Sequence, residues 1–94
     1  MRVVSVTAPG GPENLTITEA PTPELRPGEV LVKVAAAGVN RADLLQRQGY
    51  YPPPAGTSEV IGLEVSGTIA AVANEVDGWA PGDPCVALLA GGGY

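Results

Sequence analysis

Short segments separated by proline and glycine dominate this sequence and limit what it can fold into. The chain has 13 glycines and 10 prolines in 94 residues, and these residue types favour turns and interrupt regular structure. Between the turns we expect one helix at Arg41–Gln48 and strands at Arg2–Thr7, Leu15–Glu19, Val30–Ala37, Gly62–Val72 and Cys85–Ala90. Short strands at fairly regular spacing with one short helix are typical of a mainly β barrel or sandwich.

The pattern of apolar residues predicts how the strands are placed. Val30–Ala37 contains one charged residue, Lys33, so we expect this strand to be covered on both faces and to be the central strand. In the segment Gly62–Val72, apolar and polar residues alternate as in a half-buried strand. Gly62 and Gly67 within it predict bulges or close approaches of another backbone.

The helix over Arg41–Gln48 is barely two turns long and is unstable alone. We therefore expect Ala42 and Leu45 to pack on the sheet. Arg41 and Arg47 should face water or a neighbouring domain.

Composition and charge exclude several function classes. Ten acidic residues against five basic ones leave a net charge of -5, which argues against nucleic acid and against an anionic membrane surface as partners. The single Cys85 and the lack of any histidine allow neither an internal disulfide nor a Cys/His zinc cluster. No signal peptide or long apolar run is present. We expect a cytoplasmic protein.

The stretch Gly38–Pro54 contains the residues that could build a site. Asn40 stands at the junction of strand and helix, where its side chain could cap the helix by accepting a hydrogen bond from the backbone of Ala42 or Asp43. The competing role is to reach a ligand. Asp43 lies in the first helical turn, where the helix dipole favours an anion.

A pair of tyrosines follows the helix. Tyr51 precedes three prolines, which hold it in a stiff, extended path that can aim its phenol. The alternative is an aromatic ring packed on those prolines. Tyr50 could be a lid or a surface ring.

Four stretches together resemble one family: PGGPENL, PGEVLVKVAAAGVNRADLLQRQGYYPPP, IGLEVSGTI and GDPCVALLAGGGY. They are similar to the N-terminal segment of medium-chain dehydrogenases/reductases, especially the quinone oxidoreductase branch and its p53-inducible-quinone-reductase-like members. The resemblance implies that residues 1–94 form a GroES-like β-barrel catalytic domain that is incomplete. In relatives this domain is joined to a Rossmann domain that binds NADPH. The resemblance also implies a homodimer for the full-length protein.

The resemblance implies a reductase without zinc. Zinc-dependent relatives have a ligand Cys where this chain has Asn40 and a ligand His where it has Leu63. A carboxamide is a poor zinc ligand and a leucine is none. Acceptors that are already electrophilic, such as a quinone or an enone, take hydride without metal help if the protein positions both reactants.

The same resemblance assigns roles to four residues. It places Asn40 near the nicotinamide or its ribose. Tyr51 becomes a catalytic phenol that hydrogen-bonds to a quinone oxygen or supplies a proton, and Leu63 and Tyr50 complete the substrate pocket with it. The helix cap and the packed ring remain the alternatives for Asn40 and Tyr51.

Other residues are expected to be structural. We interpret Glu64 as a carboxylate that needs a partner, with Arg41 as the candidate. Trp79 and Cys85 are assigned to the core. Pro84 removes a backbone donor at the start of a strand.

Two further function classes stay open. One is a GroES-like binding module without chemistry, and the other is a segment of an enoyl-thioester reductase. Because the sequence has no GxGxxG motif behind a strand, we expect the 94-residue chain alone to be inactive. Its open strand edges should favour self-association.

Overall fold

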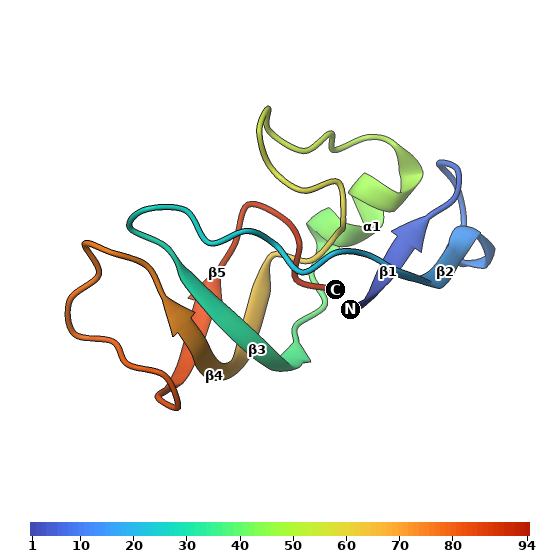
Figure 1. The fold of residues 1–94 in the computed structure, drawn as a ribbon. Helices are drawn as coiled ribbons and strands as arrows, with labels where there is room; N and C mark the ends of the chain where they lie inside the picture. Colours follow the sequence, from blue (N-terminus) through green and yellow to red (C-terminus); the bar gives the residue numbers. More distant parts are fainter.

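The computed structural model describes all residues, 1–94, and its strands form two separate antiparallel sheets (Figure 1). The elements in chain order are β1 (Arg2–Val6), the short 3-10 helix η1 (Pro12–Asn14), β2 (Leu15–Glu19), β3 (Val30–Ala37), α1 (Arg41–Gln48), β4 (Glu64–Val72) and β5 (Pro84–Leu88). The predicted mainly β fold with one short helix is confirmed. The bounds of β2, β3 and α1 agree with the sequence pattern, because turn and cap residues flank each of them.

The smaller sheet pairs β1 with β2 and holds the chain end. Its register places Ser5 beside Thr16, and the Ser5 and Thr18 hydroxyls are 2.6 Å apart. The backbone N–H of Val4 donates to the carbonyl of Tyr94 at 3.1 Å. As a result, the N-terminal strand and the C-terminal residue lie side by side near the centre of the molecule (Figure 1).

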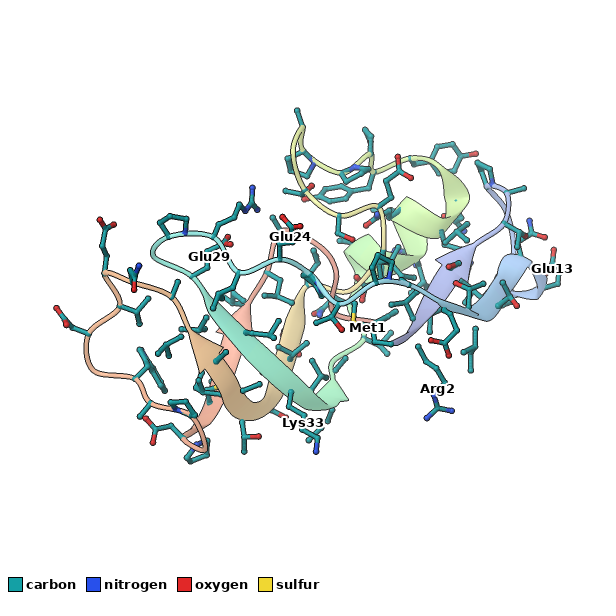
Figure 2. The ribbon with its side chains drawn as sticks, viewed as in Figure 1. Met1, Arg2, Glu13, Glu24, Glu29 and Lys33 are labelled. Carbon is teal, nitrogen blue, oxygen red and sulfur yellow. The ribbon has the colours of Figure 1, made fainter.

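The larger sheet has the order β3-β4-β5, so β4 is its central strand. The expectation that Val30–Ala37 would be central and covered on both faces is therefore wrong. As strand β3, this segment lies at an edge, and five of its eight residues are exposed. Its apolar composition indicates a strand that favours burial, but no other element of this chain covers its second half. The Lys33 side chain points away from β3 into solvent (Figure 2).

Gly67 allows β3 and β4 to approach closely, as predicted. A Cβ atom at this position would overlap the carbonyl group of Lys33. The register of the two strands shifts next to this contact, between Val34 and Ala36. A side chain at residue 67 would push the strands apart at this irregularity.

The apolar core is small and consists of side chains from β1, from β4 and from the loop before β4. Its buried residues are Val3, Ile61, Val65 and Ile69. Trp79, which we assigned to the core, is 48% exposed, so that assignment is wrong. The indole lies in the turn region between β4 and β5, over which no other element packs. Cys85 is half-buried on β5.

The short helix α1 is closed at its C-terminus by Gly49 in the left-handed conformation, with φ 89°. The backbone N–H of Tyr50 donates to the carbonyl of Leu45 at 2.8 Å, which completes a Schellman motif. Arg41 is exposed as expected. Arg47 is half-buried instead, because its Nε donates to the carbonyl of Gly10 at 3.0 Å and ties the helix to the loop after β1.

The close approach at Gly67 gives a stability prediction. Gly67→Ala should lower the free energy of unfolding by about 1 to 3 kcal/mol or more, because the added methyl group overpacks against the Lys33 carbonyl. Urea denaturation followed by circular dichroism measures the change. Ala70→Ser, at an exposed position of the same strand, is the control and should stay within about 0.5 kcal/mol. A Gly67→Ala chain as stable as the wild type would contradict the contact.

Candidate functional site

The start of α1 is built around Asn40 and Asp43, arranged as a capping box. The Asn40 backbone is extended, and its N–H donates to Asp43 Oδ2 at 2.9 Å. The Asp43 N–H donates to the Asn40 carbonyl at 3.0 Å. The Asn40 carboxamide lies at the Asp43 N–H as the other half of the capping box, although the hydrogen bond of full geometry from this N–H goes to the Asn40 carbonyl. The predicted capping position is therefore present.

Asp43 is the one charged residue that is buried in this chain, with 2% of its surface exposed. Its Oδ2 accepts a second hydrogen bond, from the Tyr94 hydroxyl at 2.7 Å. Its Oδ1 has no hydrogen-bond partner in the chain. A buried carboxylate is strongly destabilising unless donors satisfy it, so the structure here depends on both donors to Oδ2.

Tyr94 connects the chain end to this carboxylate. Its hydroxyl also lies 3.1 Å from the Gly38 carbonyl oxygen, and its backbone N–H donates to the Ile61 carbonyl at 2.9 Å. Burial of the ring, followed by the hydrogen bond and negative charge of Asp43 and the charge of Glu64, raises the pKa of Tyr94 to about 12. The phenol is therefore a stable hydrogen-bond donor at neutral pH.

Two glycines make room for this arrangement. A Cβ at Gly62, whose φ is 112°, would lie 2.7 Å from the Tyr94 ring. A Cβ at Gly38 would overlap the carboxylate of Glu64. Glu64 is half-buried against Gly38, and the proposed pairing with Arg41 is wrong, because the two ion pairs of the chain join other residues. The Arg41 side chain is exposed, and an ion pair in solvent contributes little stability.

Tyr50 and Tyr51 lie apart from this cluster, whereas Leu63 stands between its members Gly62 and Glu64. Tyr51 is 43% exposed and Tyr50 is 78% exposed, both just beyond the C-terminus of α1. Asn40 and Tyr51 therefore lie at opposite ends of a helix about 12 Å long. Leu63 is half-buried, and its carbonyl accepts a hydrogen bond from the Leu89 N–H at 2.8 Å.

These predicted residues line neither of the two main cavities. The first is an open groove of about 640 Å³ on one face of the larger sheet, with six apolar residues among its nine; it is lined by Ala36, Ala37, Gly38, Glu64, Val65, Ser66, Val86, Ala87 and Leu88. The structure thus brings Asn40 next to Asp43, but neither of these two cavities joins Asn40, Tyr51, Leu63 and Tyr50. Their assigned roles stay predictions.

The donor groups of the chain do not assemble a metal centre. No group of three or more Cys, His, Asp or Glu side chains is close enough together to hold a metal ion. The positions that the family resemblance compares with zinc ligands carry an amide at Asn40 and an isobutyl group at Leu63.

No helix is long or apolar enough to cross a bilayer.

Sequence reasoning missed the role of Tyr94. The Asn40–Asp43 spacing is a recognisable capping-box pattern, so the pair within α1 could have been found. Tyr94 reaches Asp43 across 51 residues and Gly38 across 56 residues of sequence. No local pattern connects residues so far apart. The triple glycine before Tyr94 contains a buried residue, Gly93.

The fold and this helix start define a class of domain. A family model for the alcohol dehydrogenase GroES-like domain matches residues 26–92. The chain therefore belongs to this family, and its relatives are medium-chain dehydrogenases/reductases.

Two curated relatives illustrate the range of the family. The chain is 36% identical over 89 residues to a synaptic vesicle membrane protein VAT-1 homolog-like from Mus musculus, covering 95% of this chain and 21% of the relative. It is 35% identical over 85 residues to an acryloyl-coenzyme A reductase from Sulfurisphaera tokodaii, covering 90% of this chain and 25% of the relative. The chain thus spans about a fifth to a quarter of the length of these relatives.

Three solved structures share the fold. A mycobacterial protein in complex with NADPH has a TM-score of 0.80 and 35% identity, over 95% of this chain and 28% of that one. A mycobacterial quinone oxidoreductase has a TM-score of 0.79 and 38% identity, over 97% and 28%. A cobalt- and zinc-bound alcohol dehydrogenase from Pyrobaculum aerophilum has a TM-score of 0.79 and 37% identity, over 92% and 26%. The family therefore includes both NADPH-bound and metal-bound members.

The raised pKa of Tyr94 predicts how stability depends on pH. The folded chain keeps the phenol proton up to about pH 12, whereas the ordinary value is 10.0. Between these values the folded state binds more protons than the unfolded state, so stability falls as pH rises. The contribution is complete below about pH 10 and is lost as the pH approaches about 12.

Tyr94→Phe tests this directly. Removing the hydroxyl should lower the free energy of unfolding at neutral pH by about 1 to 3 kcal/mol, because buried Asp43 loses a donor. The variant should also lose this part of the alkaline pH dependence. Denaturant titrations at several pH values measure both effects. An unchanged free energy of unfolding would mean that the hydroxyl does not support Asp43.

Proposed function

We propose that this chain is the N-terminal segment of the catalytic domain of an NADPH-dependent oxidoreductase that transfers hydride to a quinone or an activated enone without a metal. The observation that carries the proposal is the donor set at the start of α1. Asn40 stands there and Leu63 stands directly before β4, and these are the two positions that the family resemblance compares with zinc ligands. Similarity to an NADPH-bound protein and to a quinone oxidoreductase supports the cofactor and the acceptor class.

Asn40 is proposed to contact the nicotinamide end of the cofactor. Its carboxamide is half-buried at the helix start, where it forms one half of the capping box. An amide can donate to a carbonyl and accept from a hydroxyl or amide group at the same time. When bound, NADPH supplies the hydride. The pyrophosphate of the cofactor would be held by a Rossmann domain in the longer protein, because this chain has no glycine-rich phosphate loop.

Tyr51 is proposed to act on the acceptor. Its hydroxyl makes no hydrogen bond within the chain, and the ring is partly exposed on the loop after α1. Addition of hydride leaves negative charge on the acceptor oxygen, and the Tyr51 phenol would donate a hydrogen bond or its proton to that oxygen. Leu63 and Tyr50 would contribute apolar surface to the acceptor pocket, which the remainder of the protein completes.

Two alternatives remain. An enoyl-thioester reductase is favoured by the similarity to an acryloyl-coenzyme A reductase. Steady-state assays of the full-length protein with quinones, simple enones and enoyl thioesters decide between these acceptors. A GroES-like binding module without chemistry is the other alternative, and it requires that none of these acceptors is reduced. From the family resemblance we also propose that the full-length protein is a homodimer.

The role of Tyr51 is tested by Tyr51→Phe in the full-length enzyme. If the phenol supplies a proton, turnover should fall about a hundredfold or more. NADPH affinity should not change, because the hydroxyl is assigned to the acceptor. Trp79→Phe, which alters an exposed aromatic ring elsewhere, is the control. Unchanged turnover in Tyr51→Phe would return this residue to a packing role.

The absence of catalytic zinc is tested by elemental analysis of the full-length protein. We expect no stoichiometric zinc and no loss of activity with a chelator, because Asn40 and Leu63 provide no thiolate or imidazole. Stoichiometric zinc together with inactivation by the chelator would show that the metal-free mechanism is wrong.

The 94-residue chain itself should neither bind NADPH tightly nor reduce a quinone. It provides contacts to one end of the cofactor only, and hydride transfer needs both reactants held near contact distance. Calorimetry should detect no NADPH binding tighter than roughly millimolar affinity. Micromolar affinity for the isolated chain would mean that the cofactor site has been placed wrongly.

A further inference from the structure

We propose that Asp43 and Tyr94 are positioning residues that fix the backbone on both sides of Asn40 and so aim its carboxamide. The proposal rests on the function proposed above, because it takes Asn40 to be the cofactor contact. Neither Asp43 nor Tyr94 needs to touch the cofactor or the acceptor. Both would act through Asn40.

The hydrogen bonds form a bridge around Asn40. The Tyr94 hydroxyl lies 3.1 Å from the Gly38 carbonyl, which precedes Asn40 by two residues, and 2.7 Å from Asp43 Oδ2. The same Oδ2 accepts the Asn40 N–H at 2.9 Å. Asp43 Oδ2 thus holds the Asn40 amide, and the single Tyr94 proton, shared between Oδ2 at the shorter distance and the Gly38 carbonyl at the longer one, links this carboxylate to the residue two positions before Asn40. Residues 38–40 connect β3 to α1, and strand β5 does not pair with them.

Burial and backbone contacts hold both side chains of the bridge in place. Asp43 is almost fully buried, and its Oδ1 has no hydrogen-bond partner in the chain. The Tyr94 ring packs on Gly62, where even a methyl group would collide with it. The backbone of Tyr94 is held on both sides, by the Ile61 carbonyl and the Val4 N–H. The Tyr94 hydroxyl is therefore fixed by the fold before it meets Asp43.

A hydride-transfer enzyme needs such rigidity at this position. The Asn40 carboxamide lies at the Asp43 N–H as one half of the capping box, so its direction depends on the positions of its own backbone and of Asp43. A misplacement of about 1 Å in a reacting complex can lower the rate by about a hundredfold. Groups that position a ligand contact are most accurate when packing and hydrogen bonds lock their own supports.

The test is a double-mutant cycle in the full-length enzyme, with kcat/KM for NADPH as the readout. Tyr94→Phe and Asn40→Ala should each lower kcat/KM about tenfold, and the double variant should also lose about tenfold, not a hundredfold, because both changes remove the same interaction. Ser5→Ala is the matched control. It removes a hydroxyl contact in the smaller sheet and should leave kcat/KM unchanged.

Hydrogen exchange separates the bridge from the chemistry. In Tyr94→Phe, the Asn40 amide proton should exchange faster relative to the amide of Ile69, which belongs to the core strand β4. Asp43→Asn serves as a second variant in case Tyr94→Phe folds poorly, and it should accelerate exchange at the same amide.

Each outcome decides between the two ideas. Multiplicative losses of about a hundredfold in the double variant would overturn the positioning role and leave the function of Asn40 intact. Unchanged exchange at Asn40 in both Tyr94→Phe and Asp43→Asn would also overturn it. If Asn40→Ala retains full kcat/KM, the proposed cofactor contact fails and the positioning role fails with it, even where exchange confirms the bridge.

Discussion

The hydrogen bond between the Tyr94 hydroxyl and the Asp43 carboxylate is the interaction on which the centre of this structure depends. It joins the last residue of the chain to the first turn of α1. A buried carboxylate needs donors, and Asp43 receives them from Tyr94 and from the Asn40 backbone. The small sheet, the helix start and the loop before β4 all meet at this point, because Tyr94 also bonds to Val4 and Ile61.

Outside this centre, few apolar side chains are buried. Four apolar side chains are buried, while large apolar residues on the larger sheet remain exposed, among them Leu88 with 87% of its surface exposed. The groove over that sheet is mostly apolar and open. Folded proteins bury a larger fraction of their surface as they grow, and this chain spans about a quarter of its relatives.

In the proposed function, the chemistry at this centre depends on one small side chain. Asn40 occupies a helix start where Asp43 Oδ2 accepts its N–H and the Tyr94 hydroxyl lies near the Gly38 carbonyl. A carboxamide donates and accepts hydrogen bonds and is a poor zinc ligand. Metal-bound and NADPH-bound relatives share the same fold. The fold alone therefore does not determine the chemistry, as is usual for folds that host several activities.

The sequence by itself determined the local elements and the family. Asn40 and Gly49 set the ends of α1, and Pro84 and Gly67 marked a strand start and a close backbone contact, because each acts through its own backbone geometry. Only the tertiary structure decided that β4 is the central strand, that Trp79 lies outside the core, and that Tyr94 completes the centre. Those outcomes depend on which segments are available to cover a face and on contacts between distant residues, and the pattern of neighbouring residues carries no information about either.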